Sequence, residues 1–346
     1  MSSVTGRIKS VEQPRGGYIS IRKFSMTIFN DDQELSEENI HSSLVGLAVD
    51  YLFRFMITKD SNTSFDISLK GAEILGQYKN AVKLLKKVTG LDDESIVCAC
   101  KLSGYDVCYR AGISSYKPVE EIEPDKSTIE NIRIMVKRCI RFSEKNGPII
   151  EFGFTFEGAY TEIITTGDGD FLTEDTLWDL KVISKKPNKN QTLQILVYYL
   201  MGKCSNSNIF SNISKIGIFN PRLNEVYCID VSQIDDEIIN EVSLKVIGYG
   251  EIQEKTDELI TFNQIKEYTT KEVAEILNLK TSMIYKLIKN NTIKAYKKGN
   301  RYYISSEDLE QYVLHQKRLA LYWNIGIAVC ALIVVIMFIS LKLELV

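Results

Sequence analysis

The stretch with the clearest chemical potential is DGDFLTEDTLWDLK, residues 168–181. Asp179 and Lys181 are two positions apart, so on a strand their side chains project to one side while Leu180 points to the core. Asp170 precedes them across a turn, and a hairpin of this length brings its carboxylate beside that of Asp179. The pattern predicts either a metal site or the solvated charge of an amphipathic strand.

Two neighbouring carboxylates repel each other, and a bound divalent cation relieves that repulsion. Mg²⁺, or Mn²⁺ in its place, suits such a pair because it accepts one or two carboxylates and keeps water or substrate oxygens. A lysine beside the metal can hold an attacking water or stabilise the charge that builds on a scissile phosphate. The stretch therefore favours phosphodiester hydrolysis.

The order G-x-x-D and then D-x-K, at residues 167–170 and 179–181, resembles the PD-(D/E)xK nuclease superfamily. A Lys- and Asn-rich loop and QTLQILVYYLMG follow, in which Gln194 and Tyr198 share a helix face. This Q-x-x-x-Y pairing resembles the RecB-like branch. The resemblance implies that Asp170, Asp179 and the Leu180 carbonyl bind metal, that Lys181 positions the water, and that Gln194 and Tyr198 support the site and the substrate.

A further metal ligand is expected upstream. RecB-like nucleases carry G-x-x-x-H on their first core helix, and this sequence has Gly46 with Asp50 at the histidine position. An aspartate can serve as the ligand, although it changes the charge and the metal preference of the site. The other interpretation of Asp50 is a helix-surface carboxylate near Arg54. Weaker candidates for ligands are His41, Glu157 and Glu162.

Composition narrows the choice of metal. The 346 residues are 45% hydrophobic and 25% charged, which is typical of a globular protein with room for two domains. The seven cysteines form no CxxC pair and there are only two histidines, which argues against a zinc finger, an iron-sulfur cluster or a histidine-activated nucleophile. We expect a hard metal held by carboxylates.

Residues 268–312 predict a compact DNA-binding unit. Thr269 or Thr270 caps a first helix, Asn278 marks the turn into a second, Gly299 and Asn300 form the tip of a hairpin, and Ser305 or Ser306 begins a last helix. From Lys280 to Arg301 there are seven basic residues and no acidic one. Such a segment attracts phosphate backbones.

Four segments of this unit, at residues 270–277, 285–288, 293–299 and 304–312, resemble the excisionase and MerR-like helix-turn-helix family. The resemblance implies a recognition helix in the major groove and a wing against phosphates. The implied DNA-binding residues are Thr281, Ser282, Tyr285, Lys286 and Lys289 on the helix, and Lys297, Lys298 and Arg301 on the wing. The alternative of a protein-interaction module stays open.

Residues 319–341 contain no charged side chain and are long enough to cross a bilayer as a helix. Lys317 and Arg318 precede them, and this positive flank predicts that the N-terminal domains face the cytoplasm. A buried core helix is the other interpretation.

The predicted fold class is α/β: a PD-(D/E)xK nuclease-like mixed sheet flanked by helices, a small winged helix-turn-helix domain and one transmembrane helix. The expected domains are 1–250, the linker 251–267, 268–316 and 319–341. Within the first, we expect a helix near 41–55 with mostly helical sequence to 143, strands at 149–156 and 160–166, a helix at 190–201 and two strands in 214–230.

The leading hypothesis is a membrane-anchored, Mg²⁺-dependent nuclease whose partners are DNA and the membrane. The alternative is a membrane-tethered DNA-binding regulator with an inactive nuclease-like core. A homodimer is an option, since MerR-like domains that read palindromes act as dimers.

Overall fold

The computed structural model describes residues 2–249, 267–277, 279–290, 292–299, 301–305, 308, 309 and 312. The chain forms two compact units, residues 1–250 and 251–346. In the described ranges no helix is both long and apolar enough to cross a membrane. The predicted span 319–341 and residues 251–266 of the predicted linker lie outside the described residues.

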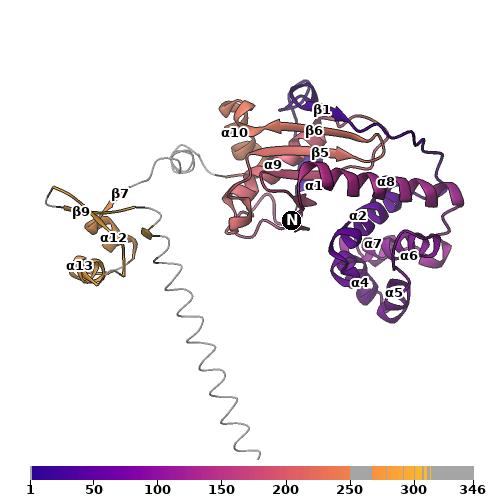
Figure 1. Ribbon diagram of the computed structural model, residues 1–346, viewed down its shortest axis with the longest axis horizontal. Coiled ribbons are helices and arrows are strands. Elements are labelled where there is room, and N and C mark those ends of the chain that lie inside the picture. The colour runs from indigo at the N-terminus through magenta and orange to yellow at the C-terminus, as the bar shows by residue number, and fades with distance from the viewer. Residues whose placement is uncertain are drawn as a thin grey trace, which may run out of the picture. The chain divides into compact units, whose positions relative to one another are not determined.

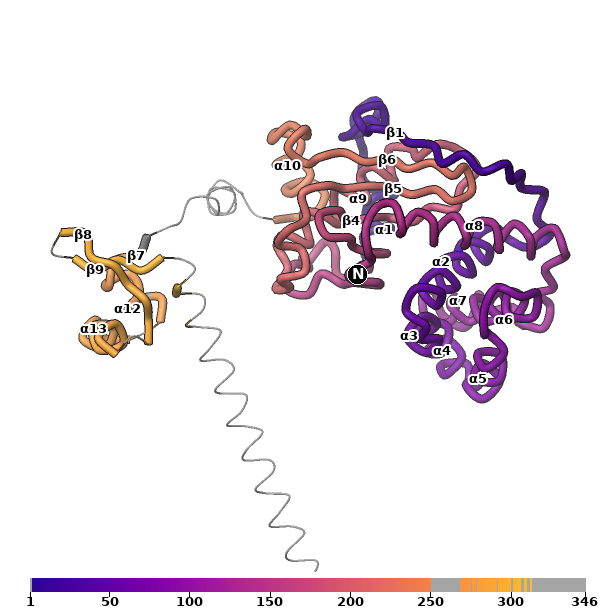
Figure 2. Tube along the Cα trace, in the orientation of Figure 1, coloured from indigo at the N-terminus to yellow at the C-terminus, as the bar shows by residue number. Residues whose placement is uncertain are grey.

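The first unit contains a six-stranded sheet in the order β1-β6-β5-β4-β3-β2. Only β4 and β5 run parallel, and every other neighbouring pair is antiparallel. Figure 2 shows β1 alongside β6, although the two strands lie near opposite ends of the unit in sequence. The strands are β1 (Ser25–Ile28), β2 (Glu151–Phe152), β3 (Phe171–Leu172), β4 (Thr176–Leu180), β5 (Lys215–Asn220) and β6 (Glu225–Asp230).

Helices cover both faces of this sheet, so the predicted α/β class with a mixed sheet is confirmed. The helices of the first unit are α1 (Val4–Ser10), α2 (Ser42–Thr58), α3 (Ser61–Ser64), α4 (Asp66–Ile74), α5 (Tyr78–Leu85), α6 (Asp93–Ser103), α7 (Asp106–Arg110), α8 (Lys126–Asn146), α9 (Lys189–Cys204) and α10 (Asp236–Glu241). The predicted helices at 41–55 and 190–201 correspond to α2 and α9.

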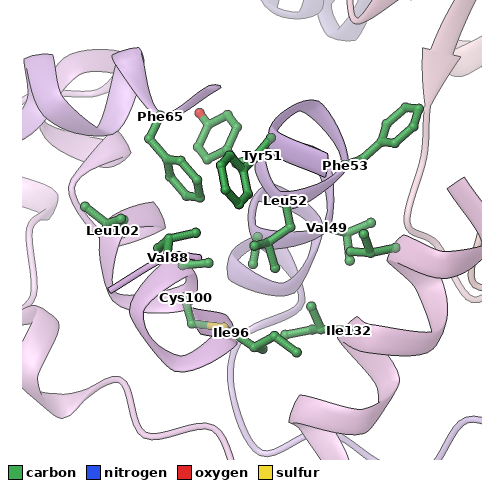
Figure 3. Close-up of a cluster of buried hydrophobic side chains, with 14 of the residues drawn as sticks. Val49, Tyr51, Leu52, Phe53, Phe65, Val88, Ile96, Cys100, Leu102 and Ile132 are labelled. Atoms are coloured by element: carbon green, nitrogen blue, oxygen red, sulfur yellow. The ribbon is translucent and has the colours of Figure 1, made fainter. Parts of the chain in front are cut away.

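The alternation of side chains along β4 creates two cores. Trp178 points to the face covered by α2 and α8, where it meets the Phe142 ring edge-on at 4.9 Å between centroids. Leu177 points to the other face, where α1 and α9 pack. In Figure 1, α8 lies between the strands β5 and β6 and the helices α2 to α7. Figure 3 shows how α2 supplies Val49 and Leu52 to the core on that side.

The connection from β4 to β5 is set locally by α9. The Asn188 side chain accepts a hydrogen bond from the first turn, and the Gln191 side-chain oxygen accepts one from the Asn188 backbone N–H. This capping box satisfies backbone groups that the helix start leaves unpaired. Because α9 packs on the sheet between the two strands it connects, β4 and β5 run parallel.

The predicted strand at 160–166 is wrong, and the one at 149–156 is reduced to β2. The Thr161 hydroxyl accepts hydrogen bonds from the amides of Ile163 and Ile164, at 3.2 and 3.0 Å, and so closes a turn in place of a strand. Thr166 makes only a single bridge, to Ser3. The alternating hydrophobic pattern here reflects a loop packed on the second core, not a sheet ladder.

The described residues of the second unit include a three-stranded sheet in the order β7-β9-β8 and the helices α12 and α13. Its elements are β7 (Glu267–Thr269), α12 (Thr270–Ile276), α13 (Thr281–Lys289), β8 (Tyr296–Lys298) and β9 (Arg301–Ser305). A small core contains Val273, Ile284 and Ile304. Thr269 and Glu272 exchange hydrogen bonds at the start of α12, as the predicted cap requires. Asn278, Asn300 and Ser306 lie outside the described residues.

Candidate functional site

Asp170 and Asp179 meet at the end of the β3–β4 hairpin. Phe171 pairs with Trp178, so the next position outward sets Asp170 opposite Asp179. The Asp170 Oδ2 accepts a hydrogen bond from the backbone N–H of Leu180 at 2.5 Å. The backbone of Asp170 is fixed as well, because its carbonyl accepts from the N–H of Gly153 at 2.9 Å.

Lys181 completes this group. It follows β4 directly, and its backbone N–H still donates to the Phe219 carbonyl at 2.9 Å, so the chain remains extended there. The Lys181 ammonium donates to Asp179 Oδ1 at 2.9 Å. Asp179 is only 1% exposed, and its other oxygen, Oδ2, is buried without a hydrogen-bond partner among the described residues. A buried, unsatisfied carboxylate oxygen is costly and marks a position where a cation or a proton is expected.

The electrostatics of the three groups are coupled. Burial, followed by repulsion from Asp179, raises the pKa of Asp170 to about 8. Burial also raises the pKa of Asp179, although the Lys181 ammonium opposes this. For Lys181, burial alone would lower the pKa, but the two carboxylates raise it above its usual value. The carboxyls therefore titrate as a pair and retain a proton near neutral pH.

The donor set fits a hard divalent cation. Both carboxylates offer oxygen ligands, and Asp179 Oδ2 has no hydrogen-bond partner among the described residues. Burial and then repulsion from Asp179 raise the pKa of Asp170, and a bound cation would relieve both effects. Mg²⁺ needs only one or two carboxylates. Within the described residues, no group of three or more His, Cys, Asp or Glu side chains forms a metal-binding cluster.

Asp50 does not join the two carboxylates directly. Both of its oxygens face the guanidinium of Arg54, at 2.9 Å each, on successive turns of α2. The Arg54 guanidinium also lies over the Phe152 ring at 5.8 Å. Asp50 is nevertheless near the site, because after burial and the groups within the site it contributes to the raised pKa of Asp170. Its geometry matches the interpretation as a carboxylate paired with Arg54, and its role as a metal ligand stays a prediction.

Gln194 and Tyr198 lie on the α9 face that covers the site. The Gln194 amide donates to the Tyr198 hydroxyl at 2.8 Å, and the two residues are only 8% and 4% exposed. Burial, and then the charges of Asp179 and Asp170, raise the pKa of Tyr198 well above its usual value. Because both side chains are buried, they are suited to support the carboxylates from the α9 side, and they offer little surface to a substrate.

The weaker sequence candidates lie elsewhere. The His41 ring accepts a hydrogen bond from the Ser43 amide at 3.2 Å and thereby caps α2. Glu157 and Glu162 are exposed on the loop that replaces the predicted strands. The six described cysteines are free thiols.

Of two cations near the site, Arg54 was expected beside Asp50 from the sequence, and Arg110 was not. Arg54 stands four residues after Asp50 on one helix. Arg110 stands four residues after Asp106, so that pairing follows from the spacing, but its contact with Asp168 does not, since Asp168 is far away in the sequence. Only the tertiary structure brings α7 to the loop that carries Asp168 and Asp170.

The second unit presents a basic surface. Ile284 and Ile288 are buried on one side of α13. The residues predicted to bind DNA lie on the other side of α13 and on the wing formed by β8 and β9. All eight of them are exposed: Thr281, Ser282, Tyr285, Lys286, Lys289, Lys297, Lys298 and Arg301. Met283, which was not predicted, is 49% exposed on the same helix.

Aromatic contacts connect α13 to the wing. The ring of Tyr285 meets that of Tyr302 edge-on at 6.1 Å, and the Lys297 ammonium lies 5.4 Å from the Tyr302 ring centroid. The Tyr285 hydroxyl is also within 3.4 Å of the Thr270 hydroxyl on α12. The recognition helix and the wing are thus held together by side chains that are themselves partly exposed.

The comparisons with known proteins agree with this geometry for the second unit. Residues 267–317 match the family described as "Helix-turn-helix domain". No curated protein and no solved structure matches the chain. The chain therefore carries a helix-turn-helix domain of the excisionase-like kind at 267–317, and this domain suggests that the protein binds DNA.

Proposed function

We propose that this protein is a Mg²⁺-dependent nuclease that hydrolyses phosphodiester bonds in DNA, with the helix-turn-helix domain retaining the DNA. The observation that carries the proposal is the group of Asp170, Asp179 and Lys181, in which Asp179 Oδ2 is buried and has no hydrogen-bond partner in the part of the chain that the structure describes. The mixed sheet, with a helix directly after the strand that bears Asp179, is the arrangement that the PD-(D/E)xK resemblance implies.

Each side chain has a role in this proposal. Asp170, Asp179 and the Leu180 carbonyl would hold Mg²⁺, or Mn²⁺. When bound, such an ion supplies neutralisation of the carboxylates and polarisation of the scissile phosphate. Lys181 would hold the attacking water and stabilise the negative charge that develops at phosphorus. Gln194 and Tyr198 would keep the carboxylates in place from the α9 side.

We also propose that residues 319–341 anchor the protein in a membrane as a single span, with the N-terminal domains in the cytoplasm. The support is the sequence: an uncharged apolar segment preceded by Lys317 and Arg318. The partners of the protein would then be DNA and the lipid bilayer.

A second function has one observation in its favour. The Asp50 carboxylate is already neutralised by Arg54, so the upstream ligand expected for an active nuclease is engaged elsewhere. A membrane-tethered DNA-binding regulator with an inactive nuclease-like core would have such a site.

Cleavage assays separate the two functions. The full chain in detergent, incubated with labelled DNA as single strand and as duplex, should cut in Mg²⁺ or Mn²⁺ and stop cutting in EDTA. Lys181→Ala should abolish cutting, while Lys185→Ala, which removes an exposed lysine from the following loop, should not. Wild-type protein that binds DNA but cuts with neither ion supports the regulator, and cutting that persists in Lys181→Ala refutes the proposed mechanism.

A further inference from the structure

Three cations lie around the candidate active site, and they differ in how free they are. The Arg54 side chain is 17% exposed and paired with Asp50, and the Lys181 side chain is 22% exposed and paired with Asp179. The Arg110 side chain, at 44%, is the most exposed of the three. A polyanionic substrate that approaches buried carboxylates needs an accessible positive charge, and Arg110 offers one.

Arg110 is held from behind by a buried carboxylate. It ends α7, and its Nε lies 3.7 Å from the Oδ2 of Asp106, which is only 2% exposed. Asp106 is fixed in turn by hydrogen bonds from the Tyr51 hydroxyl and, at 2.6 Å, from the Ser68 hydroxyl. The Nε edge of the guanidinium is therefore anchored to the protein interior, while Nη2 reaches the exposed Asp168.

On its outer side, Arg110 contacts the loop that leads into the active site. Its Nη2 lies 3.4 Å from Oδ2 of Asp168, whose side chain is 53% exposed. The segment from Asp168 to Asp170 is extended, since it pairs with Thr155, Phe154 and Gly153. Residues two apart on an extended chain point to one side and stand roughly 7 Å apart. Asp168, the residue that Arg110 contacts, thus stands roughly 7 Å from Asp170 on the same side of the chain.

We propose that Arg110 is a substrate-binding residue that contacts a phosphate of the nucleic acid adjacent to the scissile one, and that it exchanges Asp168 for this phosphate. The inference rests on the proposed nuclease function and adds a residue to it. A planar guanidinium recognises phosphate through two parallel hydrogen bonds, which an ammonium cannot do. The contact with Asp168 is long and solvated, so it is readily exchanged.

The first test uses steady-state cleavage of labelled DNA by the full chain in Mg²⁺. Arg110→Ala should raise KM by about tenfold or more, since a hydrogen bond to a charged group is lost, with a much smaller effect on kcat. Arg110→Lys should recover only part of the affinity. The matched control is Arg141→Ala, which removes an exposed arginine from α8. The helix-turn-helix domain is unchanged in every variant, so its contribution cancels.

The second test separates phosphate binding from a structural role. If Asp168 competes with phosphate for Arg110, Asp168→Asn should lower KM, and this gain should disappear in the Arg110→Ala background. A merely structural ion pair predicts instead that both single variants lower the melting temperature and that Asp168→Asn raises KM. Either that outcome or an unchanged KM in Arg110→Ala, with wild-type protein that cuts, overturns the role of Arg110 alone. Wild-type protein that never cuts overturns the nuclease function and this inference with it.

Discussion

The two units of the chain use charge in opposite ways. At the candidate active site, Asp179 is buried, Asp170 and Lys181 are partly buried, and the pKa values of the three groups are shifted by burial and mutual interaction. On the helix-turn-helix domain the basic side chains are exposed. Charges in a low-dielectric site interact strongly and act as a unit, whereas exposed charges are screened by salt and act almost independently.

This difference predicts different responses to mutation. Changing one charge at the candidate active site should remove an activity, because its neighbours depend on it. Changing one charge on the helix-turn-helix domain should weaken DNA binding by an increment. Four experiments can break or sharpen this contrast, beginning with the largest expected effect.

Asp179→Asn should reduce cleavage by about a thousandfold, comparable to the loss of one preorganised group that stabilises a transition state. The substitution keeps the shape of the side chain but removes the charge that pairs with Lys181 and that we propose to bind Mg²⁺. Affinity for DNA, measured by filter retention in EDTA, should stay within a few-fold of wild type, because the helix-turn-helix domain is intact. A parallel loss of DNA affinity would show that the two regions are not independent. Asp175→Asn, in the turn of the same hairpin, is the control.

The pH dependence of the free energy of unfolding should report the raised pKa of Asp170. The pKa of Asp170 is about 8 in the folded protein, above the value of about 3.9 for an unfolded aspartate. Between these values the folded state binds a proton that the unfolded chain has released, so without metal the stability should fall as pH rises from 4 to 8.

Mg²⁺ should reverse this trend. It competes with the proton, so its affinity should rise by up to about tenfold per pH unit and level off near pH 8. Melting temperatures recorded against pH, in EDTA and in Mg²⁺, measure both effects. Asp170→Asn should flatten both curves. A wild-type protein whose melting temperature in EDTA is constant from pH 5 to 8 would contradict the raised pKa.

The salt dependence of DNA affinity should show which exposed basic side chains contact phosphates. If Lys289 and Arg301 each contact a phosphate, the double alanine variant should lower the slope of log affinity against log salt by about 1.8. The rate of cleavage at saturating DNA should be unchanged. Lys83 and Lys86, exposed on and just after α5, provide the matched control pair and should leave the slope as it is. An unchanged slope in the Lys289 and Arg301 variant would remove these residues from the DNA interface.

The smallest effect is expected at the start of α12. Thr269→Ala removes one half of the reciprocal hydrogen bonds with Glu272 and should destabilise the helix-turn-helix domain by about 1 kcal/mol. Hydrogen exchange should accelerate in α12 but not in α9, while Thr269→Ser should restore protection. Faster exchange in α9 as well would show that the two units unfold together.

Local features were predictable from the sequence because neighbours along the chain determine them. The periodic apolar residues of α2 and α13, the Asn188 cap of α9 and the pairing of β5 with β6 all follow from short-range pattern and turn chemistry. The helix-turn-helix domain was predicted for the same reason, and the comparison with known families confirms it. The spacing of Asp170, Asp179 and Lys181 also sufficed to predict that they meet, since a single hairpin joins them.

Only the tertiary structure decided the partners that lie far apart in sequence. It shows that Asp168 contacts Arg110 and that residues 160–166 form a loop. It also shows the burial that raises the pKa values of Asp170 and Asp179. Even Asp50, whose partner is only four residues away, needed the packing of α2 against Phe152 to show which of two interpretations its geometry matches. Residue types and spacing thus determined which chemistry this protein can attempt. Burial and long-range contacts, which depend on how the whole chain packs, decided which charges are strong, which are paired and which remain open to a substrate.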